Sequence, residues 1–379
     1  MEVHATVAPR KNRGPSPAIE VAGVGLKRMY TSFCRTRIPR PRSFSAVTRI
    51  AQPLPGTHPH LMASGELTPG IAADEYARRR ERLANSLPPG SLALFPSSPL
   101  AYMAHDVPFP YHQDTDLLYL CGLLEPSSLL ACVKPADASA RWHLFVRPTC
   151  ANTAMWDGPR AGVEGAQRYF VPDGAAHALD DAPRVLHGAL WGGGSESIST
   201  LYYAPKANPA IDTLLRPVLR DAPTTSQLTP QPATPLVQRL RVIKSPAEVS
   251  LLQRSANLCA DAMNATMKAS TAAAAGNLTE VALAAHFEFE CRLAGAERLA
   301  YPCVVAGGVN AVTLHYMHNN ALLSADQMVL MDAGASLHGY ASDLTRTWPL
   351  DGRFSAEQRL LYEAVLDVNE RIINLCVLR

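Results

Sequence analysis

The spacing of apolar and polar residues changes several times along this chain and marks its predicted elements. From Thr68 onward, short apolar runs alternate with helical stretches up to about residue 220. The segment DEYARRRERLANSL (74–87) has a helix-forming composition and is followed by Pro88-Pro89-Gly90, which end a helix. Such an alternation predicts an α/β domain. Buried strands are predicted at SLALF (91–95), DLLYLCGL (116–123) and RWHLFVRP (141–148).

A segment rich in Pro and Thr, DAPTTSQLTPQPATP (221–235), interrupts this pattern and is predicted to be a linker. After it, apolar residues recur at helical spacing from about residue 249 to residue 259. Ser245 can cap this helix, and Glu248 completes a capping box. A second helix is predicted from about residue 279 to residue 293, with Gly295 ending it.

The spacing then becomes strand-like. A third helix is predicted to start at Ser355, with Gln358 three residues on, and to continue to the end of the chain. Two helices, an antiparallel sheet and a further helix define an α+β domain rather than a nucleotide-binding alternation. The predicted strands are CVVAGG (303–308), VTLHYM (312–317), QMVLMDAG (327–334) and YASDLTRTW (340–348).

Composition and charge narrow the classes of function. The chain is 47% hydrophobic and 18% charged, which is ordinary for a globular protein. Since no run approaches the roughly 20 apolar residues of a membrane span, we predict no transmembrane segment. Residues 1–50 hold ten basic side chains against two acidic ones. The remainder is therefore net negative, and nothing indicates a nucleic-acid partner.

The basic leader has the composition of an organelle transit peptide. Its stretch RMYTSFCRTRIPRPRSFSAV (28–47) is rich in Arg and Ser and contains no acid. A disordered basic tail is the alternative interpretation. The eight cysteines form no CxxC pair, and most lie in apolar runs, which fits a reducing compartment better than secretion.

Candidate chemistry lies in the stretch MDAGASLHGYASDLTRTWPL (331–350). If its two strand-like parts pair as a hairpin, Asp332 and Asp343 lie roughly opposite each other. Like charges about 5 Å apart repel, and cations between them relieve the repulsion. Two carboxylates on a rigid sheet suit hard or borderline ions such as Mn²⁺. The alternative is that Asp332 caps a turn and Asp343 is merely exposed.

Several separate motifs resemble the aminopeptidase P family of pita-bread metallopeptidases, in their order along the chain. They are YPCVVAGGVNAVTLHYMHN (301–319), the stretch from VLMDAG to EAVL (329–366), and the upstream PFPYHQDTDLLYLCGLLEPSS (108–128) and MWDGPRAGVEGA (155–166). The resemblance covers about residues 53–379. It is strongest to the mitochondrial branch, which includes intermediate-cleaving peptidases.

The resemblance implies a fold, a site and an activity. The fold is an α/β N-terminal domain followed by an α+β pita-bread catalytic domain, which is incomplete in this chain. Asp332 and Asp343 are implied as ligands of a two-metal centre, expected to hold Mn²⁺, with Zn²⁺, Co²⁺ or Mg²⁺ as alternatives. His315 is implied to line the substrate site as a catalytic residue, whereas His318 and His338 match no family role.

The implied domain limits follow the pattern described above. They are a leader at 1–50, an N-terminal domain at 53–220, a linker at 221–235 and the first part of the catalytic domain at 236–379. The implied substrates are peptide or protein N-termini, including processed mitochondrial precursors, in the matrix. Xaa-Pro aminopeptidase, Xaa-Pro dipeptidase and presequence-intermediate peptidase remain alternatives, and a homodimer is compatible with the resemblance.

The implied ligand set raises a difficulty. The family's centre needs two Asp, one His and two Glu, yet no histidine follows His338, and the later acids Glu357, Glu363, Asp367 and Glu370 fall on the last predicted helix. We therefore expect a truncated product or incomplete gene model of an active enzyme. This polypeptide would then bind metal weakly and show little peptidase activity. A non-catalytic binding protein on the same fold is the alternative.

Overall fold

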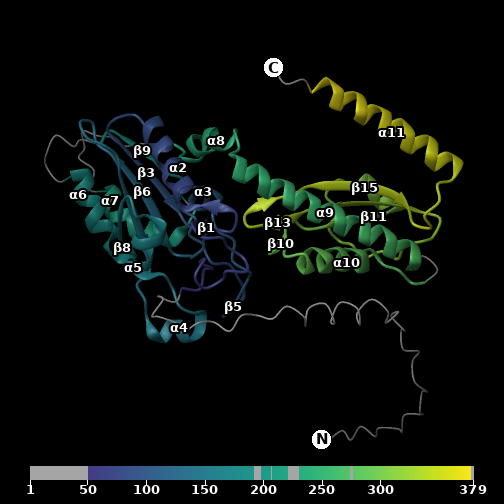
Figure 1. Ribbon diagram of the computed structural model, residues 1–379, viewed down its shortest axis with the longest axis horizontal. Helices are drawn as coiled ribbons and strands as arrows, with labels where there is room; N and C mark the ends of the chain where they lie inside the picture. Colours follow the sequence, from purple (N-terminus) through teal and green to yellow (C-terminus); the bar gives the residue numbers. More distant parts are fainter. Residues whose placement is uncertain (1–49, 192–197, 206, 221–229, 274–275, 377–379) are drawn as a thin grey trace, which may run out of the picture. The chain divides into compact units, whose positions relative to one another are not determined.

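The computed structural model describes residues 50–191, 198–205, 207–220, 230–273 and 276–376 (Figure 1). The predicted leader and most of the predicted linker lie outside these residues. No helix of the described chain is both long enough and apolar enough to cross a membrane.

The first part of the described chain is built on a five-stranded mixed sheet. Strand β3 pairs antiparallel with β6 and parallel with β9, and β7 pairs antiparallel with β6 and parallel with β8. In spatial order the strands are β8 (Ala175–Ala178), β7 (Arg141–Val146), β6 (Leu129–Lys134), β3 (Ser91–Pro96) and β9 (Thr200–Tyr202).

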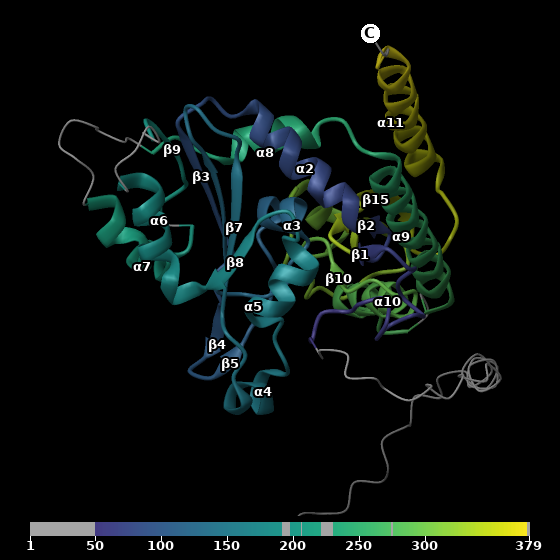
Figure 2. The ribbon, with the colours of Figure 1, turned by 60° about the vertical axis from the view of Figure 1, so that its left-hand side comes forward.

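Both faces of this sheet are covered by helices, because its strands alternate between two cores. Ala93, Cys132 and Leu144 face a core shared with α2 and α3. Leu92 and Val133, one residue along, face a core shared with α6 and α7 (Figure 2). This confirms the predicted α/β arrangement. The helices are α2 (Ala73–Ser86), α3 (Thr115–Cys121), α5 (Gly162–Gly165) continued by η1 (Ala166–Phe170), α6 (Ala182–Trp191) and α7 (Pro209–Arg220).

One predicted strand is wrong, because residues 115–121 form helix α3. Its N-cap Asp114 accepts hydrogen bonds from the backbone N–H groups of Asp116 and Leu117, both at 3.0 Å. Gly122 ends the helix in the left-handed conformation, with φ of 70°. The apolar residues of DLLYLCGL fit a buried helix as well as a strand, and a cap of about 1 kcal/mol favours the helix.

Short elements complete this part of the chain. Val237 and Leu240 of helix α8 belong to the same core as the buried residues of α2. The residues of α8 fall at the end of the predicted linker and the start of the predicted catalytic domain. The domain limits themselves remain predictions. The elements are β1 (Glu66–Thr68), β2 (Ile71–Ala72), β4 (Tyr102–Ala104), β5 (Val107–Pro108), α4 (Ala151–Asp157), η2 (Leu179–Asp181) and α8 (Thr234–Arg241).

The second part consists of two long helices packed on small antiparallel sheets. Helix α9 begins with the predicted capping box, since Ser245 N–H donates to Glu248 at 2.8 Å and Glu248 N–H to Ser245 Oγ at 3.2 Å. Thr279 caps α10. The elements are α9 (Pro246–Ala273), α10 (Glu280–Leu293), the sheet of β11 (Val304–Gly307), β12 (Met328–Ala333) and β15 (Leu344–Pro349), and the sheet of β10 (Arg298–Leu299), β13 (Ala335–Leu337) and β14 (Tyr340–Ala341).

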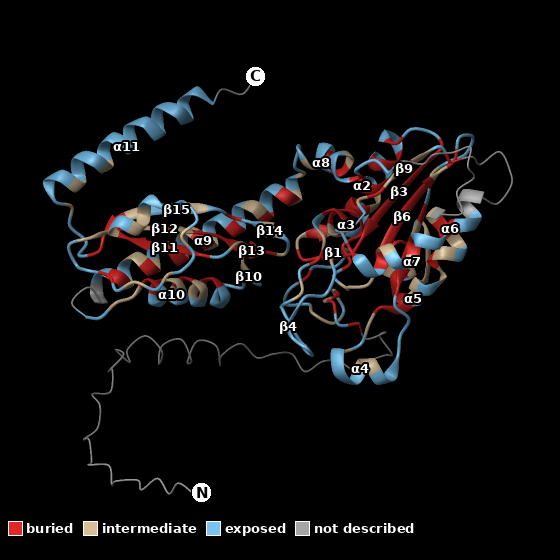
Figure 3. Ribbon diagram, turned by 180° about the vertical axis from the view of Figure 1, so that it is seen from behind, coloured by how far each residue is buried: buried red, intermediate tan, exposed pale blue. Residues whose placement is uncertain are grey.

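The last helix, α11 (Ala356–Leu375), starts with the predicted capping box of Ser355 and Gln358. None of its residues is buried within the described part of the chain (Figure 3). Leu361 and Ile373 keep 66% and 61% of their surface exposed. The predicted helix is thus confirmed, and its apolar side chains remain exposed within the described residues.

A pair of histidines joins two strands at one edge of the five-stranded sheet. His143 Nδ1 on β7 lies 3.1 Å from His177 Nε2 on β8. Burial, followed by the neighbouring His177 and Arg141, lowers the pKa of His143 to about 4. The hydrogen bond requires one ring to accept, so the pair favours neutral imidazole.

We therefore predict an acid-sensitive contribution to stability. The folded pKa of His143 is below its unfolded value, so the contribution is complete above about pH 6.5 and is lost as the pH falls toward 4. Between pH 7 and pH 4, the free energy of unfolding measured in urea should fall by about 1–3 kcal/mol more in the wild type than in the His143→Phe variant. The exposed His60→Phe serves as the control, and equal losses in all three proteins would contradict the prediction.

Candidate functional site

The candidate site begins with the alternation of strand β12. Val329, Met331 and Ala333 are fully buried in a core shared with α9 and α10. Because successive side chains of a strand point to opposite faces, Asp332 lies on the other face and remains partly accessible. The core thus places one carboxylate on the side of the sheet that the helices do not cover.

The second carboxylate reaches the same region by a different route from the one predicted. In the register of β12 and β15, Asp332 pairs with Thr345, and Asp343 lies just before β15. The chain between them does not form a simple hairpin, because β13 and β14 join the separate sheet of β10. The two carboxylates are therefore not strand partners directly opposite each other.

What brings them together is the hydroxyl of Tyr301, which the sequence interpretation missed. The Tyr301 hydroxyl lies 2.5 Å from Asp332 Oδ1 and 2.8 Å from Asp343 Oδ1. Burial, followed by the two carboxylate hydrogen bonds, raises the pKa of Tyr301, so it stays a neutral donor. A hydroxyl has one hydrogen and donates to one carboxylate at a time. The local sequence gave no signal for this role, since the contact spans 31 residues.

The glycine of the Asp-Ala-Gly motif has a steric role in this arrangement. A Cβ at Gly334 would lie 2.0 Å from the backbone oxygen of Ser342 and 2.9 Å from the Tyr301 ring. Ser342 is held there by a hydrogen bond from its N–H to Ala335 O at 2.9 Å. Only glycine permits this approach, and the approach places Asp343 next to Tyr301.

His315 is not tied to the two carboxylates by any contact in the described structure. The predicted strand VTLHYM is wrong: β11 is followed by the 3₁₀ turn η3 (Gly308–Val312), and residues 313–315 form an exposed turn. Among the described residues, none forms a hydrogen bond or ion pair with His315. His338, which matches no family role, lies in a turn with φ of 53°, and its imidazole pairs with Glu297 at 2.8 Å.

The two aspartates fit part of a metal site. One oxygen of each carboxylate lies within hydrogen-bond distance of the Tyr301 hydroxyl. Carboxylates are the ligands that Mn²⁺ and Mg²⁺ prefer. Within the described ranges, however, no group of three or more His, Cys, Asp or Glu side chains is placed to hold an ion. Asp332 and Asp343 thus fit only part of a ligand set.

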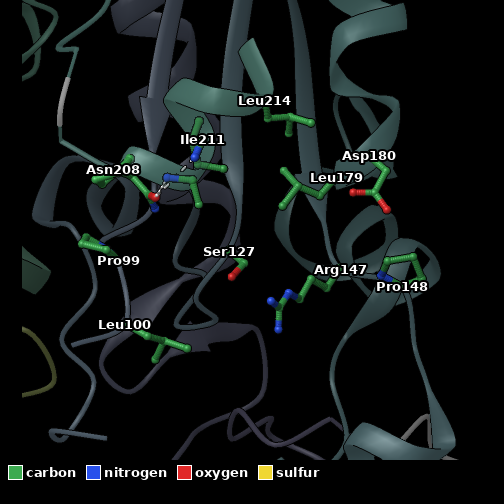
Figure 4. A pocket seen from close by; sticks show the side chains of 12 residues that line it. Pro99, Leu100, Ser127, Arg147, Pro148, Leu179, Asp180, Asn208, Ile211 and Leu214 are labelled. Atoms are coloured by element: carbon green, nitrogen blue, oxygen red, sulfur yellow. Dashed lines mark hydrogen bonds between the residues drawn. The ribbon is translucent and has the colours of Figure 1, made fainter. Parts of the chain in front are cut away.

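A further cavity lies in the N-terminal α/β part. It has a volume of about 700 Å³ and an apolar wall that includes Leu179, Ile211 and Leu214. Figure 4 shows Arg147 extending toward Ser127 across it. None of the aspartates or the histidine discussed above lines this cavity, so it is separate from the candidate metal site.

Two segments of the chain match models of known protein families. Residues 76–197 match the aminopeptidase P N-terminal domain, and residues 250–377 match metallopeptidase family M24. The Xaa-Pro aminopeptidase of Escherichia coli is 30% identical over 311 residues, which are 80% of this chain and 68% of that protein. The chain therefore belongs to the aminopeptidase P family of metallopeptidases, which confirms the resemblance. Family membership implies a divalent metal.

Other relatives point to one branch of the family. Xaa-Pro aminopeptidase 3 of Rattus norvegicus is 39% identical over 340 residues, 86% of this chain and 65% of that protein. The mitochondrial intermediate cleaving peptidase 55 of Arabidopsis thaliana is 36% identical, over 90% of this chain and 66% of that protein. The chain thus spans about 65% of the length of these curated relatives.

Solved structures confirm the fold class. Aminopeptidase PepP of Pseudomonas aeruginosa matches with a TM-score of 0.70 and 35% identity, covering 79% of this chain and 67% of that one. Proline aminopeptidase P II of Yersinia pestis matches with a TM-score of 0.72 and 29% identity, covering 79% and 68%. The α/β N-terminal domain and the pita-bread catalytic domain are thereby both supported.

The packing at Gly334 leads to a second prediction. Gly334→Ala should lower the free energy of unfolding by about 3 kcal/mol or more, because the nearest obstacle is backbone rather than a movable side chain. Gly188→Ala in α6 is the matched control: its Cβ meets nothing within 4 Å, so alanine should stabilise that helix by about 0.5–1 kcal/mol. Urea unfolding measures both, and a neutral Gly334→Ala would contradict the steric argument.

Proposed function

We propose that this protein is a metal-dependent aminopeptidase that removes the N-terminal residue of peptides by hydrolysis. The observation that carries the proposal is the convergence of Asp332 and Asp343 on the Tyr301 hydroxyl. This convergence occurs within the segment that matches a metallopeptidase family. Two carboxylates held on a rigid sheet, on the face away from the core, are suited to bind a cation and to leave it accessible to substrate.

Each residue has a distinct role in this proposal. Asp332 and Asp343 would hold divalent metal, expected to be Mn²⁺ because all donors present are oxygen atoms. The bound metal would supply Lewis-acid activation of water and of the scissile carbonyl. Tyr301 fixes the two carboxylates relative to each other. His315 would donate a hydrogen bond to the carbonyl oxygen as negative charge develops there.

The proposed substrates are peptides with an accessible N-terminus. Xaa-Pro peptides and processed mitochondrial precursors are both proposed, since the relatives are named Xaa-Pro aminopeptidase and intermediate cleaving peptidase. A homodimer is the proposed assembly. Besides the two aspartates, the family's centre implies one histidine and two glutamates. These three ligands would complete the coordination sphere.

Substitutions at the three site residues separate metal binding from catalysis. Asp332→Ala and Asp343→Ala should each abolish Mn²⁺ binding and peptidase activity, since each removes a metal ligand. His315→Ala should keep the metal and lower turnover on an Xaa-Pro peptide by about 10²–10³-fold, the usual effect of losing one oxyanion donor. The measurements are metal content and initial rate, on protein expressed from the full reading frame.

The matched control is His318→Ala, which removes an exposed histidine of the same segment. It should change neither metal content nor rate. Loss of metal from His315→Ala would show that its assigned role is wrong. Full activity of Asp343→Ala would contradict the proposed site as a whole.

The proposed location is the mitochondrial matrix, with the leader cleaved within residues 1–50. In PRSFS (41–45), Arg42 lies two residues before a cut after Ser43, which would leave Phe44 at the new N-terminus. An intermediate-cleaving peptidase would remove Phe44, so this protein would trim its own intermediate. An alternative start at Met29 leaves this processing site unchanged.

We predict that the protein isolated from mitochondria begins at Ser45. N-terminal sequencing tests this, with the inactive Asp343→Ala variant as the control, which should accumulate with Phe44 at its end. A wild-type end at Phe44 would exclude self-trimming. An intact Met1 in cytosolic protein would contradict the mitochondrial location.

A further inference from the structure

The segment that carries His315 is poorly supported by apolar packing. Val312 and Leu314 keep 82% and 87% of their surface exposed, and Met317 keeps 58%. Residues between η3 and residue 321 form no strand and no α-helix. A segment of this kind needs polar contacts to keep a defined position, because few buried apolar contacts hold it.

One buried carboxylate supplies those contacts along the segment. Glu280, the first residue of α10, is fully buried. Its Oε1 accepts hydrogen bonds from Gly307 N–H at 2.9 Å and from Asn310 Nδ2 at 3.0 Å. Its Oε2 accepts from the Tyr316 hydroxyl and from Ala321 N–H, both at 2.9 Å.

All four donors are neutral, and together they satisfy both carboxylate oxygens. Burial acts to raise the pKa of Glu280, but the Gly307 N–H and the other donors outweigh it, so the pKa is lowered and the group is charged. Hydrogen bonds to a buried charge are stronger than neutral ones. Asn319 adds a second anchor, accepting from Val305 N–H at 2.9 Å and donating to Cys303 O at 2.7 Å.

The anchors connect the segment to the strand next to the aspartates. Gly307 ends β11, and Val304 of the same strand pairs with Asp332 on β12. Tyr316, held by Glu280, directly follows His315. One carboxylate therefore links the sheet that holds the aspartates to the residue next to the histidine.

We propose that Glu280 is a positioning residue, whose buried carboxylate holds the His315 segment in register with the Asp332 and Asp343 pair. This inference rests on the proposed function for the role of His315, but the anchoring itself does not. Glu280 would act through the segment, since its carboxylate accepts hydrogen bonds from residues 307–321 and not from the aspartates or His315.

The test uses Glu280→Gln, which keeps the size of the side chain and replaces one acceptor oxygen by an NH₂ group. At least one backbone or side-chain donor then faces another donor. In the 379-residue chain, amide hydrogen exchange of fragments within 308–321 should become about 10-fold faster, with exchange in α9 and β12 unchanged. Glu290→Gln, the same change on the same helix, is the matched control and should match the wild type.

The kinetic arm asks whether Glu280 acts through His315. In metal-loaded protein from the full reading frame, Glu280→Gln should lower kcat/KM by about 10-fold without loss of metal. Glu280→Gln combined with His315→Ala should be no slower than His315→Ala alone, since a positioning residue has no effect once its target is gone.

The outcomes separate the inference from the proposed function. Unchanged exchange in 308–321, or equally faster exchange in α9 and β12, would overturn the anchoring. Additive losses in the double variant would overturn action through His315. If the wild type hydrolyses no peptide, the proposed function fails, while the exchange result still decides the anchoring.

Discussion

Strand β12 is buried on one face and accessible on the other, and the site depends on this constraint. Val329, Met331 and Ala333 must face the core of α9 and α10, because burying each side chain contributes on the order of 1–3 kcal/mol. A slip of one residue in register would bury Asp332 and expose Met331, at a cost that no local preference offsets. Core packing thus fixes the position of a residue that takes no part in the core.

The remaining parts of the site are contacts that make this position usable. Two carboxylates near one another repel unless a donor or a cation lies between them. Tyr301 provides the donor, and Gly334 allows Ser342 and hence Asp343 to come close enough to share it. The geometry of the site therefore depends on the Tyr301 hydroxyl and on Gly334 as well as on the two aspartates.

The same sheet is linked to the His315 segment by polar contacts rather than by apolar packing. Glu280 satisfies four donors spread over residues 307–321, which an apolar side chain could not do. As in the capping boxes of α9 and α11, a side-chain oxygen accepts hydrogen bonds from backbone N–H groups, but the Glu280 carboxylate does so over a longer stretch of chain. It leaves the tip of the segment exposed and still gives it a defined place.

Local chemistry determined what the sequence alone could predict. The capping boxes at Ser245 and Ser355 and the stop at Gly295 involve residues within one turn of each other, so their pattern is legible in the chain. The family motifs likewise identified Asp332, Asp343 and His315 as candidates. The sequence could not separate helix from strand at residues 116–123, because apolar spacing fits both and the decision came from the cap at Asp114. Tertiary structure alone decided the contact of Tyr301 with both aspartates and the reach of Glu280, because these join residues about 30–40 positions apart and depend on how sheet and helix pack.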